Sequence, residues 1–441
     1  MRVKQTYHKL DWIDDYINNV RPYIFVRTED NILIKRPNQA TQINSSGAHI
    51  LKYLLQGESI HHLLQKVGAD KAEEIELFML AVKNFCEGKL DEFTLNSAVE
   101  TKTFSKEFSK LPVLSEFAIT YKCNIQCKFC YAGCNCTSNP IESNSELSLT
   151  DCYKIIDRIY KEAKVPSISF TGGEPTLRRE VLLACIRYAH ELGMRVNLIT
   201  NGTLIDEDYA RALVDAKLDS VQVSIEGITA KTHDHIVSNN GAFEKSIRTV
   251  GYFKKLGIHV HTNTTLNRLN LEESYSLPQF VKSLGLDRFS MNLIIPTGSS
   301  ILNKELVVSY SEVGEVIEAI HETSKQECIE FMWYSPVPMC MFNTITEGLG
   351  NKGCAACDGL LSVAPNGDVL PCASYDQPVG NIHTTPFNDV WQNNDSKFFR
   401  EKQFAHDVCQ SCDHLALCNG GCPLYWRNKG YEELFQTQKT S

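Results

Sequence analysis

Three cysteines near the first quarter of this 441-residue chain have a type and spacing that suggest chemistry. Cys123, Cys127 and Cys130 follow a C-x3-C-x2-C pattern directly after the apolar run 117–120. An iron–sulfur cube is held by cysteine thiolates, and each of its four irons needs a ligand. Three clustered thiols would leave one iron open to a small molecule, whereas a closed structural site supplies four protein ligands.

An alternative is that the spacing i, i+4, i+7 puts three small buried residues on one face of a helix. The residues between the cysteines are polar, however, and the stretch follows a strand-like run without a break. That arrangement favours a loop at the end of a strand over a core helix.

The sequence CNIQCKFCY, residues 123–131, resembles the cluster loop of the radical S-adenosylmethionine (SAM) enzymes. The resemblance implies that Cys123, Cys127 and Cys130 hold a 4Fe-4S cluster whose open iron is chelated by the amino and carboxylate groups of SAM. One electron then cleaves SAM to a 5'-deoxyadenosyl radical. An electron donor such as a flavodoxin or ferredoxin is therefore an expected partner.

The composition of the chain argues against nucleic-acid-binding and membrane-spanning proteins. A net charge of -9 argues against a broad nucleic-acid surface. No apolar run approaches the ~18 residues of a membrane span, and the N-terminus lacks the hydrophobic region of a signal peptide, so we expect a cytoplasmic protein without a membrane partner. The 17 cysteines are then interpreted as metal ligands, because cytosolic thiols stay reduced.

Between residues 113 and 325 strand patterns alternate with helix patterns. A capping box at Ser148 opens a helix to residue 163, and Gly193 closes a helix over 179–192. Six strand–helix units predict an α/β fold with a parallel sheet curved into a partial (β/α)6 TIM barrel, and with chemistry at the C-terminal edge of the strands. The predicted strands are 117–120, 167–170, 195–200, 220–225, 259–265 and 288–295.

Gly172, Gly173, Glu174 and Pro175 end the second predicted strand. Paired glycines let bare backbone approach a ligand, and the glutamate offers an acceptor, although a plain turn has the same composition. At this distance from the cysteines the segment resembles the GGEP segment that holds the amino group of SAM. The resemblance therefore implies that these four residues bind the cofactor.

Three later strand ends extend the resemblance. Asn201 lies in a Thr-Asn-Gly sequence that is either a simple turn or the family segment that lines the SAM site. Ser224 lies in S-I-E-G, which resembles the family's SLDG, and Asn263 ends the fifth strand, near where the family contacts adenosine. Val237 stands where related sequences supply an arginine to the SAM carboxylate. His233 and His235 are candidate substitutes, but exposed loop histidines are the simpler interpretation.

The last ninety residues contain a second set of paired cysteines, C-x9-G-x4-C from Cys357 and C-x2-C-x5-C-x3-C from Cys409. Alone, this pattern suggests zinc ribbons. With N-G-D-V-L-P-C at 366–372 and V-G-N-I at 379–382, it resembles the SPASM extension, which carries auxiliary iron–sulfur clusters. The candidate ligands are Cys340, Cys354, Cys357, Cys372, Cys409, Cys412, Cys418 and Cys422.

The resemblance implies one or two auxiliary clusters. The first would use Cys372 and Cys422 with Cys354 or Cys357, and Cys340 as a further candidate; the second would use the cysteines at 409, 412 and 418. The family's closing cysteine is missing from residues 423–441. Either the second cluster has a non-cysteine or open site, or Cys340, Cys354 and Cys357 are distributed differently.

Residues 1–95 predict a hairpin, 23–26 with 31–34, followed by helices over 46–55, 59–67 and 70–86. This winged-helix layout resembles the PqqD-like domain, which binds the leader of a precursor peptide by strand addition. The alternative is a generic winged helix for interaction or dimerisation. The predicted organisation is a recognition domain at 1–95, a linker at 96–112, a radical SAM core at 113–325 and a SPASM domain at 326–441.

Together these resemblances imply a radical SAM maturase that modifies a ribosomally made precursor peptide by thioether or carbon–carbon crosslinking, or by epimerisation. An anaerobic sulfatase maturase fits poorly, because that group has an acidic residue where Ala373 follows Cys372. A maturase of a haem-like or other small cofactor is a second alternative. A non-catalytic iron–sulfur carrier or sensor is a third, against which the GGEP segment argues.

Overall fold

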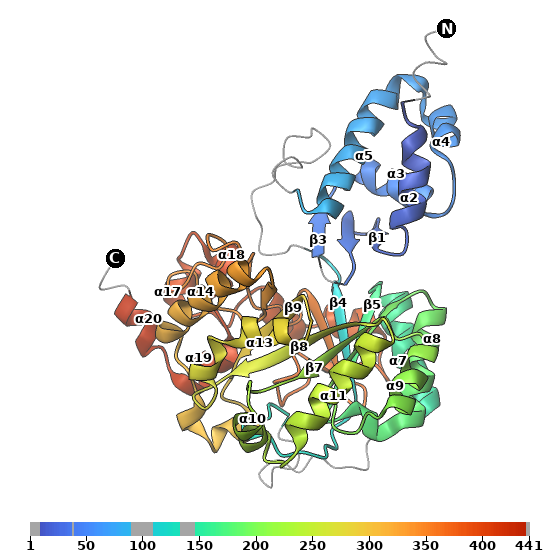
Figure 1. Ribbon diagram of the computed structural model, residues 1–441. Helices are drawn as coiled ribbons and strands as arrows, with labels where there is room; N and C mark the ends of the chain where they lie inside the picture. The colour runs from blue at the N-terminus through green and yellow to red at the C-terminus, as the bar shows by residue number, and fades with distance from the viewer. Residues whose placement is uncertain (1–8, 38, 90–108, 133–145, 438–441) are drawn as a thin grey trace. The chain divides into compact units, whose positions relative to one another are not determined.

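The computed structural model describes residues 9–37, 39–89, 109–132 and 146–437. It divides into two compact units, Met1–Leu114 and Ser115–Ser441 (Figure 1). The predicted linker at 96–112 lies mostly outside the described residues. None of the helices in the described ranges is both long and apolar enough to cross a membrane.

The N-terminal unit contains a three-stranded antiparallel sheet in the order β1-β2-β3. The predicted hairpin and three helices are confirmed, whereas α2 and β3 were not predicted. Strand β3 has a single apolar residue, Ala40, so it lacks the apolar alternation that marks a strand. The elements are α2 (Asp11–Val20), β1 (Ile24–Arg27), β2 (Ile32–Lys35), β3 (Gln39–Gln42), α3 (Ser45–Leu55), α4 (Ile60–Val67) and α5 (Ala72–Glu87).

The C-terminal unit is organised around a ten-stranded sheet in the order β10-β9-β8-β7-β6-β5-β4-β11-β12-β13. The seven strands from β4 to β10 are parallel, as the six predicted strands required, and β10 adds a short strand that was not predicted. The parallel strands are β4 (Leu114–Thr120), β5 (Ser167–Gly172), β6 (Arg195–Thr200), β7 (Ser220–Ser224), β8 (His259–Leu266), β9 (Arg288–Leu293) and β10 (Glu330–Trp333).

Helices cover the outer face of these parallel strands (Figure 1). The predicted cap is present, because Ser148 Oγ accepts the Asp151 N–H at 3.2 Å, but the helix ends in a π-helical turn, Arg158–Glu162. The main helices are α7 (Leu149–Asp157), α8 (Arg179–Glu191), α9 (Glu207–Asp215), α10 (Ala230–Val237), α11 (Ala242–Lys255), α13 (Leu277–Ser283) and α14 (Tyr310–Glu327).

The strands alternate apolar residues, which pack against the helices, with polar residues on the opposite, inner face. A row of polar side chains crosses three strands there: Ser220 Oγ donates to Asn197 Oδ1 at 2.7 Å, and Asn197 Nδ2 donates to Ser169 Oγ at 3.3 Å. Gln222 on β7 and His261 on β8 continue this row and are hydrogen-bonded at 3.2 Å. Complete TIM barrels fill this interior with branched apolar side chains. The inner face of this barrel is polar instead.

The cysteine-rich C-terminal region continues the same sheet, since β11 (Leu360–Val363) lies beside β4 and is followed by β12 (Asp368–Leu370) and β13 (Gly380–Asn381). The short helices that follow also contact the barrel helices. Phe387 N–H, at the start of α15, donates to Glu162 Oε2 at 2.8 Å. These helices are α15 (Phe387–Trp391), α16 (Asn394–Arg400), α17 (Asp407–Gln410), α18 (Leu415–Cys418), α19 (Pro423–Lys429) and α20 (Glu432–Thr437).

Candidate metal centres and cofactor site

Residues 121–131, the cluster loop, leave the C-terminal end of β4 without forming a helix, as predicted. Two backbone N–H groups of the loop donate to the last turn of α10: Gln126 to the Val237 carbonyl at 3.1 Å and Lys128 to the Ile236 carbonyl at 3.0 Å. On the other side, Ser299 N–H donates to the Cys130 carbonyl at 2.9 Å. The loop is therefore fixed between α10 and the segment after β9.

The three thiols of the cluster loop share one desolvated site. Burial raises the pKa of Cys127 well above the ordinary thiol value, and neighbouring groups, including the thiols of Cys130 and Cys123, raise it further. Burial likewise raises the pKa of Cys123 to about 11. Because the charged forms of the Cys123 and Cys127 thiols are disfavoured by burial and by their neighbours, a bound cationic group is what would stabilise thiolates here.

Within the described parts of the chain, no three His, Cys, Asp or Glu side chains converge closely enough to hold one metal ion. A tetrahedral zinc site needs that convergence. An iron–sulfur cube distributes its thiolates over separate irons, so its ligands lie further apart.

Val237 packs where the family pattern places an arginine. It is buried with Ile125 and Ala242, and this apolar group contacts Cys123 and Cys127. The residue therefore forms part of the apolar wall of the cluster loop. It offers no side-chain donor to a carboxylate.

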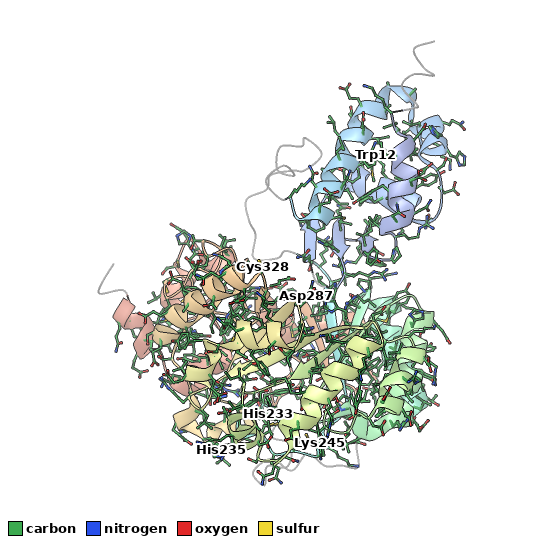
Figure 2. All side chains as sticks on the ribbon, viewed as in Figure 1. Trp12, His233, His235, Lys245, Asp287 and Cys328 are labelled. Atoms are coloured by element: carbon green, nitrogen blue, oxygen red, sulfur yellow. The ribbon has the colours of Figure 1, made fainter. Side chains whose placement is uncertain are left out.

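The interpretation of His233 and His235 as exposed loop histidines is wrong for His233. Both lie on α10 (Figure 2), where His233 occupies the buried face and accepts the Glu226 N–H at 3.0 Å. Burial lowers the pKa of His233 to about 4, so the ring is neutral at neutral pH. His235 is exposed on the same helix.

Gly172 and Gly173 are required by backbone contact with the start of the cluster loop. A Cβ on Gly172 would lie 2.0 Å from the Thr120 carbonyl oxygen, and one on Gly173 would lie 2.3 Å from the Lys122 carbonyl oxygen. The close approach allows Gly173 N–H to donate to Thr120 and Glu174 N–H to Lys122, both at 2.8 Å. The bare backbone thus contacts the loop that bears the cysteines.

Glu174 is buried and saturated by donors of the protein. Its carboxylate accepts hydrogen bonds from the Thr176 backbone and hydroxyl, the Thr200 hydroxyl at 2.8 Å and the Asn201 N–H at 2.8 Å. Burial raises its pKa and these bonds oppose the rise. Pro175 opens the 3-10 turn that carries Thr176. The side chain of Glu174 therefore joins the ends of β5 and β6, instead of standing open as the predicted acceptor.

Asn201 contacts the cluster loop directly. Its Nδ2 donates to Asn124 Oδ1 at 3.0 Å and lies 4.0 Å from Cys123 Sγ. Ser224 and Asn263 are in register on the neighbouring strands β7 and β8. The Asn263 Oδ1 accepts the Ser290 hydroxyl at 2.8 Å. The structure thus brings Asn201 to the cysteines, and places Ser224 and Asn263 on the adjacent strand ends.

Two glutamates were not among the predicted site residues. Glu226 follows β7, accepts the Thr265 N–H at 2.8 Å and has a pKa raised to about 8 by burial; its charge also acts on Cys127. Glu116 lies on β4, and its carboxylate accepts hydrogen bonds from Ser362 and from the Ala373 N–H. The position of Glu226 directly after a strand was a signal available in the sequence. The surroundings of Glu116 could not be predicted in the same way, because they depend on the pairing of β4 with β11, a strand far along the sequence.

Three cysteines of the C-terminal region form a first thiol group, Cys354, Cys372 and Cys422. Burial raises the pKa of Cys372, and the thiols of Cys422 and Cys354 raise it further. Burial raises the pKa of Cys422 to about 12, and Cys354 adds to this shift. Burial also raises the pKa of the Cys357 thiol, which is hydrogen-bonded to Ser396 and is influenced by the Cys354 thiol.

A second thiol group consists of Cys340, Cys409, Cys412 and Cys418. Burial raises the pKa of Cys409 to about 11. The other three thiols of the group raise it further. The N–H of Met339, the residue before Cys340, donates to Cys418 Sγ at 3.3 Å. Cys340 therefore lies with the second group, and not with the first, where it had been a candidate.

Family models match both cysteine regions. Residues 117–276 match the radical SAM superfamily, and residues 354–413 match the iron–sulfur cluster-binding SPASM domain. The chain is a radical SAM enzyme with a SPASM domain. Membership implies a 4Fe-4S cluster and SAM as cofactors, and the three thiols of the cluster loop provide the soft donor set that such a cluster requires.

This radical SAM enzyme resembles relatives that act on different substrates. It is 28% identical over 325 residues to the AdoMet-dependent heme synthase of Nitratidesulfovibrio vulgaris, an alignment that covers 70% of this chain and 86% of the relative. It is 25% identical over 342 residues to the PqqA peptide cyclase of Bradyrhizobium diazoefficiens, covering 74% and 84%. Sequence similarity alone does not choose between these substrates.

A solved structure extends the likeness to more of the chain. Streptococcus suis SuiB, crystallised with its precursor peptide SuiA, superposes with a TM-score of 0.66 at 19% identity, and the alignment covers 91% of this chain and 95% of SuiB. The likeness at this identity concerns the fold. It includes most of the N-terminal unit, since only 9% of the chain is left out.

Proposed function

We propose that this radical SAM enzyme modifies a ribosomally made precursor peptide, forming a thioether or carbon–carbon crosslink. The observation that carries the proposal is the N-terminal unit, whose sheet has two edges, β1 and β3, within the described residues. Edge strands present unpaired backbone groups, and peptide-recognition domains use them to add a strand. The fold likeness to SuiB, which was crystallised with a precursor peptide, includes most of this unit.

Strand β3 is well suited to leader binding. Its residues, Gln39–Gln42, are exposed or half-buried, so a peptide strand beside it would meet backbone and polar side chains. We therefore assign leader recognition to residues 1–95, as a PqqD-like domain. A leader held there raises the effective concentration of the core peptide at the barrel, which relaxes what the active site must recognise by itself.

The polar inner face of the barrel supports a peptide substrate. A peptide brings N–H and C=O groups that must find partners when they leave water. Several inner-face atoms are buried and have no hydrogen-bond partner among the described residues, including Glu116 Oε1 and His261 Nδ1. Such atoms provide both acceptor and donor positions for an incoming polar chain.

The residues around the cluster loop have separate proposed roles. Cys123, Cys127 and Cys130 would hold the cluster, and SAM bound to it would supply the radical that abstracts hydrogen from the substrate. Gly172, Gly173, Glu174 and Pro175 set the turn beside the loop, while Asn201 holds it through Asn124. Ser224 and Asn263 would border the cofactor on the neighbouring strand ends. A flavodoxin or ferredoxin would deliver the electron.

Auxiliary clusters are the remaining proposed cofactors. Cys354, Cys372 and Cys422 would hold the first, because their thiols lie within electrostatic range of one another. Cys357 stays a further candidate for this cluster, since its thiol is within electrostatic range of Cys354 and is also hydrogen-bonded to Ser396. The cysteines at 409, 412 and 418 would hold the second.

Maturation of a small cofactor is the second candidate, favoured by the 28% identity to the heme synthase. The two proposals are separated by one experiment. Protein purified and reconstituted without oxygen is given SAM, dithionite and either the short peptides encoded beside its gene or an iron porphyrin. We expect 5'-deoxyadenosine together with a peptide that has lost two hydrogens. Conversion of the porphyrin, with every peptide unchanged, would overturn the peptide proposal.

A further inference from the structure

The second thiol group joins two segments that are far apart in the sequence. Cys409, Cys412 and Cys418 come from the α17–α18 region, and Cys340 comes from the loop 334–342 that follows β10. The matched SPASM model covers residues 354–413 and so does not include Cys340. What places Cys340 beside the other three thiols is the way this loop is fixed.

Tyr310, the first residue of α14, fixes the loop to the SPASM region. Its buried hydroxyl donates to the Pro336 carbonyl at 2.9 Å and accepts the Cys422 N–H at 3.1 Å. The ring packs against Tyr425 with centroids 3.9 Å apart. One side chain therefore ties the start of the loop to the end of the C-x3-C segment.

Two further contacts hold the turn that carries Cys340. Met339 N–H donates to Cys418 Sγ at 3.3 Å. Pro338 lies so close to Gly421 that a Cβ on the glycine would be 2.9 Å from Pro338 Cγ. Hydrogen bonds from the N–H groups of residues 341 and 342 to the Pro338 carbonyl, at 2.9 and 3.0 Å, close the turn. Cys340 is thus held at the second thiol group from both sides.

We propose that Cys340 is the fourth ligand of the second auxiliary iron–sulfur cluster, together with Cys409, Cys412 and Cys418. The donor set fits the group, since four thiolates are the usual ligands of a 4Fe-4S cluster. Residues 423–441 contain no cysteine that could complete the second cluster. In this assignment Cys340, from upstream in the chain, supplies that fourth thiolate instead. The assignment rests on the presence of this cluster and not on the peptide substrate.

Four protein ligands close the cluster, so no iron is open to substrate or solvent ligands. The first thiol group consists of three thiols, with the Cys357 thiol within electrostatic range of Cys354 and hydrogen-bonded to Ser396. The assignment therefore restricts the second cluster to electron transfer. Oxygen or nitrogen donors near the group, Asp413 and His414, are the competing ligands.

The test uses the full chain with the three cluster-loop cysteines replaced by alanine, so that only auxiliary iron is counted. Cys340→Ala is compared with Cys328→Ala, which removes an exposed cysteine at the end of α14 (Figure 2). Iron and acid-labile sulfide are measured after anaerobic reconstitution, and electron paramagnetic resonance spectra are recorded before and after reduction.

We expect Cys340→Ala to lose one iron per chain and give the spectrum of a three-iron cluster, or to lose the whole second cluster, while Cys328→Ala keeps the full iron content. Cys340→Ser, which keeps the side-chain volume and an oxygen donor, should retain the cluster with a shifted reduced spectrum. Unchanged iron, sulfide and spectra in both Cys340 variants would overturn the assignment. So would loss of iron in Asp413→Ala or His414→Ala with none in Cys340→Ala.

Discussion

The cluster loop and the second thiol group both bring cysteine thiols together, but from differently spaced parts of the chain. The loop gathers three thiols from eight consecutive residues, 123–130, and is fixed by backbone contacts with α10, with the turn after β5 and with the segment after β9. The second group gathers four thiols from segments about 70 residues apart and depends on Tyr310 and Met339 to bring them together. The comparison teaches that an open site can be built locally, whereas closing a site here requires a distant part of the chain.

The largest expected effect comes from removing a ligand of the open site. Cys127→Ala should abolish SAM cleavage and lower total iron by the content of one cluster, because the site loses one of three thiolates. The iron of the two C-terminal thiol groups should stay. Iron analysis and 5'-deoxyadenosine assays check both points. If the C-terminal iron were lost as well, the two regions would not be independent.

A backbone substitution tests whether the cluster loop depends on its contact with the turn after β5. Gly173→Ala would place a Cβ 2.3 Å from the Lys122 carbonyl, so the loop must shift, and we expect most SAM cleavage to be lost. Gly251→Ala is the matched control, because it makes the same change on α11 where nothing lies within 4 Å. That variant should keep activity and gain up to about 1 kcal/mol of stability. Equal activity in both variants would contradict the contact.

Asn201 tests a smaller contribution to the same loop. Asn201→Ala removes the hydrogen bond to Asn124 Oδ1, which contributes about 1 kcal/mol, and so should lower SAM affinity or cleavage by roughly fivefold. Titration of SAM against the reconstituted enzyme gives the SAM affinity, and the iron content is measured in parallel. A normal affinity with normal iron would show that the side chain does not order the loop.

The smallest expected effect is a dependence of stability on pH at α10, the helix that supports the cluster loop. Burial holds the pKa of His233 at about 4, below its ordinary value of 6.5, so the folded state disfavours protonation. The stabilising contribution is present above pH 6.5 and is lost as the pH falls toward 4, by about 1 kcal/mol near pH 5.5.

Hydrogen–deuterium exchange at the imidazole carbon, followed by mass spectrometry, measures the pKa of His233 directly. Urea unfolding at pH 7.5 and 5.5 measures how much the free energy of unfolding changes between the two pH values. His233→Gln should make this pH-dependent change smaller. His235→Gln, an exposed change on the same helix, is the control. A pKa near 6.5 for His233 would mean that the ring is accessible to water.

The parts of the fold that could be predicted from the sequence were those with local patterns. The strand at residues 195–200 alternates buried and half-buried positions, and the cysteine spacing placed the cluster loop at the end of β4. Strand β3 has one apolar residue, Ala40, and β10 has only four residues, so neither gave a usable pattern. These two strands are recognisable only through their pairing with β2 and β9.

The candidate site shows the same limit. The glycines at 172 and 173 were predicted correctly to let the backbone approach a neighbour closely. The sequence did not indicate that this neighbour would be the start of the cluster loop. His233 was misjudged because its burial depends on how α10 packs against the rest of the chain. Cys340 could not be assigned to a group, since its contact with Cys418 spans a long stretch of sequence that has no pattern of its own.

The central claim is that three thiols of the cluster loop hold an iron–sulfur cluster that binds SAM for radical formation. The most direct measurement is the yield of 5'-deoxyadenosine from the anaerobically reconstituted full chain with SAM and dithionite. We predict a yield that exceeds one per chain and falls to background in Cys127→Ala. A chain that carries its full iron content and forms no 5'-deoxyadenosine under these conditions would contradict the account.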